Sequence, residues 1–185
     1  LGTGIKSLMP KEVLGNYPKK FKKVIFIYLD GFGWNEFEKI KTKSEFLKKI
    51  TNEGIVSKIT SQFPSTTASH ITSIHTGMSV GRTGIFEWFQ FNPKVGNIMS
   101  PLLFSLGYSN KRNKLYEAGI NPMDVFPKNT FYKHLSRYNI KSYVAQSSSF
   151  TPSPLGNVVF QGCNKVLAFN NIEEGCDLLS SLINN

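Results

Sequence analysis

The sequence predicts an α/β fold with a mostly parallel sheet and helices on both faces of that sheet. Residues 23–77 follow the order strand, helix, strand, helix, which is the order that gives parallel sheets. The apolar run at 24–29 is continuous rather than alternating, as in strands covered on both faces. With 40% hydrophobic residues among 185, a substantial core can form. We expect residues 1–185 to form a single α/β domain, with residues 1–20 as an arm at its surface.

The first half of the chain predicts two strands and two helices. Residues 23–30 are expected to form a buried strand, and residues 54–62 a second strand. A helix from residue 35 or 36 to residue 52 is predicted between them, because apolar residues recur on one stripe before Asn52 and Gly54. The residues of this stripe are Phe37, Ile40, Phe46, Leu47 and Ile50. A second helix is predicted over residues 67–75, and Gly77 ends it.

The second half of the chain is less regular up to residue 130. The aromatic residues 85–91 predict an extended segment, and residues 93–124 predict long loops with short helical pieces. Beyond them, we expect helices over residues 130–138 and 172–183, and strands over residues 141–145, 157–160 and 165–169.

The net charge of +10, from 22 Lys and Arg against 12 Asp and Glu, raises the question of nucleic acid as a partner. The basic residues are scattered, however, and those between Lys39 and Lys49 are spaced as on the solvated face of a helix. The densest cluster is Lys19, Lys20, Lys22 and Lys23. We therefore expect no dedicated nucleic-acid surface, but a positive field that attracts small anionic substrates.

The two cysteines and the hydropathy bear on the compartment. Cys163 and Cys176 have no CxxC spacing, so two buried free thiols are expected, with a disulfide as the alternative. No apolar stretch approaches the ~20 residues that cross a bilayer, and the first residues lack the pattern of a signal peptide. We expect a cytoplasmic protein without a membrane segment.

Two residues stand where an α/β sheet places chemistry, at the carboxyl ends of its strands. Asp30 ends the first predicted strand, where a carboxylate is a frequent metal ligand, although an Asp before Gly31 also suits a plain turn. Thr67 begins the helix after the second predicted strand, where a helix N-terminus favours a phosphate and helps to activate a hydroxyl. A simple N-cap is the alternative for this Thr66-Thr67 pair.

The segment from Val24 to Gly33, followed by the segment from Phe63 to Gly77, resembles the N-terminal half of the type I phosphodiesterase and nucleotide pyrophosphatase family. This family lies within the alkaline phosphatase superfamily, so the resemblance implies an alkaline-phosphatase-like fold that is incomplete in this chain. It also implies that Asp30 ligates a metal and that Thr67 is the nucleophile and a metal ligand, with Thr66 beside it at the substrate.

The resemblance implies a metal-dependent hydrolase of phosphodiester or nucleotide pyrophosphate bonds, acting on a small phosphate ester. It implies two divalent metal ions, zinc in most members, and a phosphothreonyl intermediate on Thr67. Further Asp and His ligands belong to the family's C-terminal half, and no Asp-His-Gly segment is present here. We therefore expect this 185-residue piece to be inactive alone and unable to hold zinc stoichiometrically.

The sequence departs from the family at a position that contacts the substrate phosphate in many members. Where many members place an asparagine, this chain has Trp88, which is expected to line a pocket for a flat substrate group. A role for Trp88 in the core is the alternative. His70, His75 and His134 lack ligand spacing and are expected to pack or to lie at the surface.

Two other interpretations remain open. The same nucleophile serves phosphonate hydrolases, phosphomonoesterases and phosphoethanolamine transferases of the superfamily. A second class is a non-catalytic module on the same fold, whose basic surface binds an anion or nucleic acid.

Overall fold

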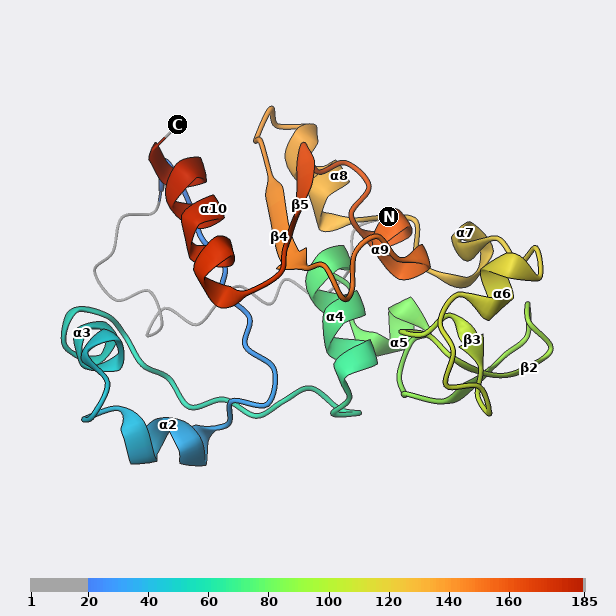
Figure 1. Ribbon diagram of the computed structural model, residues 1–185, viewed down its shortest axis with the longest axis horizontal. Helices are drawn as coiled ribbons and strands as arrows, with labels where there is room; N and C mark the ends of the chain where they lie inside the picture. The colour runs from blue at the N-terminus through green and yellow to red at the C-terminus, as the bar shows by residue number, and fades with distance from the viewer. Residues whose placement is uncertain (1–19, 185) are drawn as a thin grey trace. The chain divides into compact units, whose positions relative to one another are not determined.

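The computed structural model describes residues 20–184, and the chain divides into two units, Leu1–Ser61 and Gln62–Asn185. The expected arm at residues 1–20 falls almost wholly outside the described residues. The single domain that we expected therefore stays a prediction, and each unit is described below by itself. Figure 1 shows the elements of both units along the chain.

The described part of the first unit contains two helices, α2 (Trp34–Ile40) and α3 (Glu45–Glu53). The single helix predicted from residue 35 or 36 to residue 52 is therefore wrong, because the chain turns between them and starts again at Ser44. The Ser44 hydroxyl caps α3 by accepting a hydrogen bond from the Leu47 N–H. Lys58 lies over the Trp34 ring, 5.8 Å from its centroid.

Neither predicted strand of the first unit is formed. Residues 23–29 and 55–62 carry no strand assignment, and no residue between 20 and 61 is buried. Val24 and Ile59, for example, are 79% and 83% exposed. A strand needs a neighbour to complete its backbone hydrogen bonds, and a doubly covered strand needs a layer on each face. The described residues of this unit supply neither.

The second unit holds the core. Its helices and strands, in chain order, are α4 (Thr67–Thr76), α5 (Val80–Thr83), β1 (Gln90–Asn92), β2 (Asn97–Ser100), β3 (Ser105–Leu106), α6 (Lys114–Glu117), α7 (Pro122–Val125), α8 (Phe131–Ser136), β4 (Tyr143–Ser147), α9 (Pro154–Val159), β5 (Lys165–Phe169) and α10 (Ile172–Asn184). Apolar side chains from several of these helices are buried together. The residues with less than 2% exposure include Ile85, Met99, Phe104, Val158 and Val159.

Two small sheets form in this unit. Strands β1, β2 and β3 pair antiparallel in that order, and β4 pairs parallel with β5. The mixed helix and sheet content agrees with the predicted α/β class. The prediction of a mostly parallel sheet is wrong for residues 20–184. The two predicted strands at residues 23–30 and 54–62 stay unpaired, and residues 90–106 form antiparallel hairpins.

The parallel pair β4–β5 has helical elements on both faces. Val144 and Val166, which are partners in the ladder, face the core to which α4, α8 and α9 contribute. Phe169 has the opposite parity along β5, and Gly175 of α10 lies against its ring. Figure 1 shows α10 beside this sheet. None of the helices in the described range combines the length and hydropathy that spanning a bilayer requires.

Several predicted elements are confirmed and one is wrong in type. Strand β5 has the predicted bounds, α4, α8 and α10 differ from theirs by a few residues, and β4 is shifted by two residues. Residues 157–160, predicted as a strand, belong mainly to α9. That helix starts because Pro154 occupies its first position and the Ser153 hydroxyl accepts from the Gly156 N–H.

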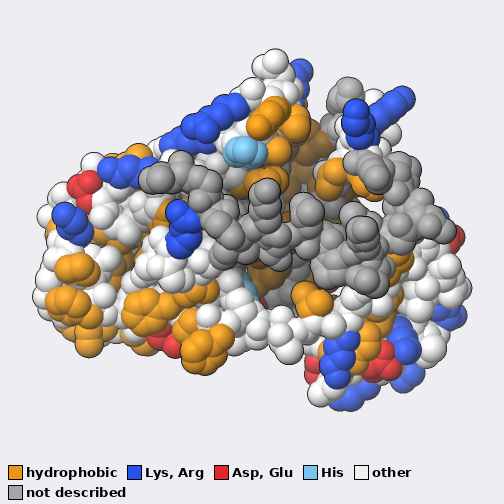
Figure 2. All heavy atoms as spheres, turned by 180° about the vertical axis from the view of Figure 1, so that it is seen from behind, with side chains coloured by type: hydrophobic (Ala, Val, Ile, Leu, Met, Phe, Trp, Pro, Cys, Tyr) orange, Lys and Arg blue, Asp and Glu red, His pale blue; other side chains and the backbone are white. Residues whose placement is uncertain are grey.

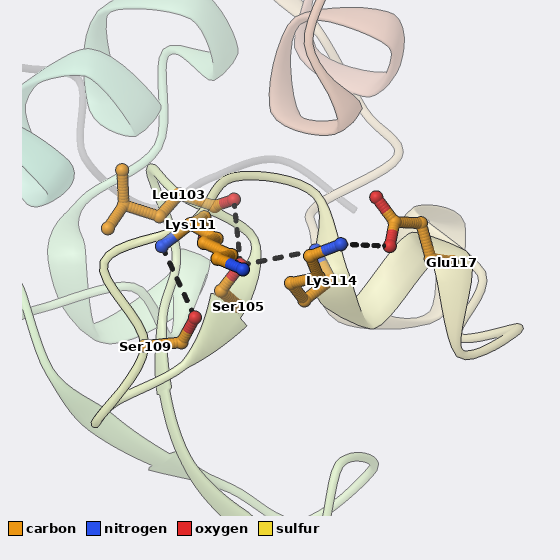
Figure 3. A network of polar contacts seen from close by, with 6 residues as sticks. All are labelled: Leu103, Ser105, Ser109, Lys111, Lys114 and Glu117. Atoms are coloured by element: carbon orange, nitrogen blue, oxygen red, sulfur yellow. Dashed lines mark hydrogen bonds and ion pairs between the residues drawn. The ribbon is translucent and has the colours of Figure 1, made fainter.

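A buried serine organises the loop between β3 and α6. The Ser105 hydroxyl is fully buried, contacts the Leu103 and Lys111 carbonyl oxygens, and accepts a hydrogen bond from the Lys114 N–H. Figure 3 shows these contacts together with the ion pair between Lys114 and Glu117. This single hydroxyl therefore fixes both ends of the basic loop between β3 and α6, a segment for which the sequence predicted no regular structure.

Candidate active site at the start of helix α4

Helix α4 begins where the sequence predicts, and its first turn is fixed by hydroxyl groups. Thr66 is the N-cap, and its Oγ1 accepts from the Ser69 N–H at 3.3 Å. The buried Ser69 hydroxyl lies 2.8 Å from the Pro64 carbonyl oxygen and 2.9 Å from that of Thr66. The Phe63–Pro64 peptide bond before this turn is cis. Gly77 ends the helix in the left-handed conformation that a glycine adopts readily.

Thr67 is the first residue of this ten-residue helix and is half-buried. The first N–H groups of a helix have no carbonyl partner in a preceding turn and point toward the end of the helix, and that of Ser69 is bound here by Thr66 Oγ1. These donors and the positive end of the helix dipole favour an anion such as a phosphate group. The structure thus places Thr67 where the sequence expected it, at a helix N-terminus.

The loop with Trp88 is linked directly to the start of α4. Thr66 Oγ1 donates a hydrogen bond to the Phe86 carbonyl oxygen at 3.2 Å, twenty residues further along the chain. Phe86, Trp88 and Phe89 are all more than a third exposed, and the Trp88 and Phe89 rings meet edge to face at 6.4 Å. Trp88 is therefore not a core residue, and an aromatic surface lies next to the helix start.

Buried Gln90 holds this loop in shape and was not found by sequence reasoning. Its side-chain oxygen accepts from the N–H groups of Phe86 and Glu87, at 2.9 and 3.3 Å. Its side-chain nitrogen donates to the Gly84 carbonyl oxygen at 2.8 Å. Gln90 has the same parity along the chain as Phe86 and Trp88, which are exposed, so alternation within residues 85–91 gives no signal for its burial.

Asp30 belongs to the first unit and lies in a turn whose next residue, Gly31, has φ 71°. The sequence predicted a carboxylate at the tip of a buried strand, and the structure shows an exposed carboxylate after an exposed segment. Partial burial of Tyr28 and the negative charge of Asp30 raise the pKa of the Tyr28 hydroxyl. Asp30 and Thr67 belong to different units, and each is described here with its own unit.

The donor set that two zinc ions require is not assembled within residues 20–184. No group of three or more His, Cys, Asp or Glu side chains in this range could hold a metal ion. Catalytic zinc normally takes three protein ligands for each ion. Asp30 and Thr67 alone are fewer ligands than such a set requires.

His75 of α4 packs in the interior and His134 of α8 lies at the surface, which are the two roles that the sequence predicted for the histidines. His75 Nδ1 shares a hydrogen bond of 2.7 Å with the Tyr132 hydroxyl, and its ring meets the edge of Phe160 at 4.8 Å. Burial lowers the pKa of His75 from 6.5 to about 4. His134 is exposed and contacts the Tyr138 ring.

Both cysteines are free thiols, which excludes a disulfide between Cys163 and Cys176 in this structure. The prediction that they are buried is wrong, because Cys163 is only partly buried and Cys176 is exposed on α10. Burial raises the pKa of the Cys163 thiol, so the thiolate form is disfavoured there.

Comparisons with known proteins bear on the first part of the chain. Residues 24–101 match the family model of type I phosphodiesterase / nucleotide pyrophosphatase. The match spans Asp30, Thr66, Thr67 and Trp88. Comparison with curated proteins and with solved structures gave no match for this chain. The resemblance inferred from the sequence is therefore confirmed over residues 24–101, which are similar to the type I phosphodiesterase / nucleotide pyrophosphatase family.

Proposed function

We propose that this protein is a hydrolase of phosphodiester or nucleotide pyrophosphate bonds and that Thr67 is its nucleophile. The observation that carries the proposal is the position of Thr67 as the first residue of α4, inside the segment that matches the family model. The hydroxyl of Thr67 and the N–H groups of the first turn then lie at the same end of the helix. A phosphate bound at that end is close to both.

The proposed reaction has two steps. In the first, Thr67 Oγ loses its proton and forms a bond to phosphorus while the bond to the leaving oxygen breaks, and the leaving group takes up a proton. In the second, water attacks the phosphothreonine, the bond from phosphorus to Thr67 Oγ breaks, and the hydroxyl is restored. The N–H groups of the first turn of α4 offset the negative charge on the phosphate oxygens in both steps.

Thr66 and Trp88 are proposed to support substrate binding in different ways. The Thr66 hydroxyl accepts from Ser69 and donates to the Phe86 carbonyl oxygen, so a direct contact with substrate would displace one of these hydrogen bonds. Its main contribution is to fix the direction of the helix start. The exposed Trp88 ring offers a flat apolar surface to the group esterified to the phosphate.

Metal dependence, with two divalent ions and zinc as the preferred metal, is part of the proposal because the family generally depends on divalent metals. Asp30 is the proposed ligand in the first unit, and Thr67 the proposed ligand in the second. The fold that the family implies for the whole catalytic domain is alkaline-phosphatase-like.

The direct test replaces Thr67 in the full-length gene product and measures hydrolysis of bis(4-nitrophenyl) phosphate with added Zn²⁺. Thr67→Ala should lower kcat by about three orders of magnitude or more, whereas Thr67→Ser should keep measurable activity. Thr51→Ala is the matched control, because this exposed threonine of α3 only donates to the Leu47 carbonyl oxygen. Undiminished turnover by Thr67→Ala would overturn the assignment of the nucleophile.

A substrate panel and a metal titration complete the test. Diesters should be hydrolysed faster than 4-nitrophenyl phosphate or a phosphonate, and the opposite order would favour one of the other superfamily activities. Asp30→Asn should raise the Zn²⁺ concentration that the full-length protein needs for half-maximal activity. Residues 1–185 alone should bind no stoichiometric zinc by calorimetry. If the full-length protein binds phosphate but hydrolyses no substrate, the non-catalytic anion-binding module is the correct interpretation.

A further inference from the structure

The second unit carries a long stretch of chain without any acidic side chain. Between Asp124 and Glu173 the sequence has no Asp or Glu, but it has five Lys or Arg residues and His134. The basic residues are Lys128, Lys133, Arg137, Lys141 and Lys165. Lys128 pairs with Asp124 at 3.7 Å, outside the stretch. The remaining charges produce a positive field that no carboxylate of this stretch compensates.

The centre of this stretch places cations and exposed aromatic rings on one face. Phe131, His134 and Arg137 follow at intervals of three residues from the start of α8 to its C-cap, and Tyr138 comes four residues after His134. The opposite side of the helix is buried through Tyr132. We call the surface formed by Phe131, His134, Arg137 and Tyr138, together with Lys141 three residues further along the chain, the α8 face.

The side chains of the α8 face are open to solvent. Tyr138 is 66% exposed, and Phe131 is 45% exposed. Arg137 and Lys141 are exposed as well. The Tyr138 and His134 rings meet at 5.2 Å and an angle of 61°, so the tyrosine ring is held in place while much of it remains accessible. Figure 2 shows Lys and Arg side chains close to an exposed histidine and hydrophobic side chains on the surface.

Helix stability alone does not require this composition. Cations in the last turn of a helix stabilise its C-terminus, which accounts for Lys133 and His134. Lys133 is in addition held by the Lys128 carbonyl oxygen and the Gln161 side chain. Lys141 lies after the end of α8 and before the start of β4, too far along the chain to stabilise the C-terminus of α8. The exposed Tyr138 side chain is uncharged, so it does not interact with the helix dipole either. An alternation of cations with open aromatic rings is the arrangement that binds single strands, through phosphate contacts and base stacking.

We propose that the α8 face is a binding surface for single-stranded nucleic acid, with phosphates on Arg137 and Lys141 and a base stacked on Tyr138. The sequence led us to expect no dedicated nucleic-acid surface, because the basic residues are scattered over the whole chain. In the structure, four of the five side chains follow at helical spacing on α8 and the turn after it, where the His134 and Tyr138 rings meet. This site is distinct from the start of α4 and does not depend on hydrolysis.

Binding is tested with the full chain by fluorescence anisotropy, using labelled oligo(dT) and oligo(U) 15-mers at 50 and 200 mM salt. We expect binding of at least one of the two, with an affinity that falls as salt rises. Arg137→Gln with Lys141→Gln should weaken binding about tenfold or more. The slope of log K against log salt should become shallower by about 1.4, because each phosphate that the protein neutralises on a single strand contributes about 0.7.

Two matched variants separate this surface from general attraction of a basic protein. Lys39→Gln with Lys49→Gln removes the same charge from α2 and α3 and should leave binding within about twofold of the wild type. Tyr138→Ala should weaken binding by about tenfold, whereas Tyr138→Phe, which keeps the ring, should not. Circular dichroism confirms that each variant is folded.

Several outcomes would overturn the proposal. These are absence of binding at 50 mM salt, equal losses for the two double variants, and insensitivity to Tyr138→Ala. Equally tight binding of a poly-glutamate peptide would also overturn it, because an acidic peptide satisfies the cations without a base to stack. The difference between oligo(dT) and oligo(U) shows whether DNA or RNA is the preferred strand.

Discussion

Protonation of His75 should destabilise the second unit at mildly acidic pH. The ring is packed between α4 and α8, where it shares a hydrogen bond with the Tyr132 hydroxyl and contacts Phe160. Burial lowers the pKa of His75 from 6.5 to about 4 in the folded protein. The unfolded chain therefore binds a proton at a pH where the folded protein does not, so the free energy of unfolding falls as the pH falls.

The magnitude follows from the two pKa values. Each pH unit of difference corresponds to about 1.4 kcal/mol, so full protonation costs the folded state about 3 kcal/mol. The stabilisation is complete above pH 6.5 and is lost as the pH falls toward 4. Between pH 7.5 and pH 5 the loss amounts to about 2 kcal/mol. That is a substantial part of the 5–15 kcal/mol typical of a domain.

Urea denaturation, followed by far-UV circular dichroism between pH 7.5 and pH 5, measures this loss. His75→Gln removes the titrating group and should make the stability of the second unit nearly independent of pH in this range, although the variant is less stable at pH 7.5. His134→Gln, on the exposed side of α8, is the control and should keep the wild-type loss. The reasoning is refuted if His75→Gln loses as much stability as the wild type, or if the NMR titration of His75 has its midpoint near 6.5.

The remaining predictions concern the backbone of the second unit, with thermal unfolding as the measurement. Gly162 has φ 93°, and a Cβ there would lie 2.6 Å from the Lys133 backbone nitrogen, so Gly162→Ala should lower stability by about 3 kcal/mol or more. Gly77→Ala, with φ 66° and open space around it, should cost only about 1 kcal/mol, and equal costs would contradict the role of crowding. Thr66→Ser should retain the cap of α4, whereas Thr66→Val should lose about 1 kcal/mol together with the link to Phe86; equal melting temperatures for these two variants would show that the cap is unimportant.

The elements that the sequence predicted well are those specified by nearby residues. Helix α4 has a threonine N-cap at one end and Gly77 at the other, and both signals are local. Strand β5 is a short apolar run between polar turns, and its predicted bounds agree with the structure. The caps at Ser44 and Ser153 are equally local, but each lies beside a run of apolar residues whose pattern also fits a longer helix or a strand.

The rest depended on contacts that no local pattern contains. Whether residues 24–29 form a strand depends on a neighbouring strand, and among residues 20–61 none is present. The antiparallel pairing of β1 with β2 rests on a turn at Gly96, which was predicted as part of a loop. For the candidate site, the sequence predicted the position of Thr67 at the start of a helix. The hydrogen bond from Thr66 to the Phe86 carbonyl oxygen joins residues twenty positions apart, and no local pattern predicts it.

The side-chain amide of Gln90 has a consequence for how the aromatic loop meets a ligand. Three hydrogen bonds from one buried residue must break together before residues 84–87 can change shape. The amide protons of Phe86 and Glu87 should therefore exchange with solvent only when the whole hairpin opens. Such a loop does not behave as a lid that closes over an occupant. A molecule arriving at Trp88 meets a surface that is already formed, and little conformational entropy of the loop is lost on binding.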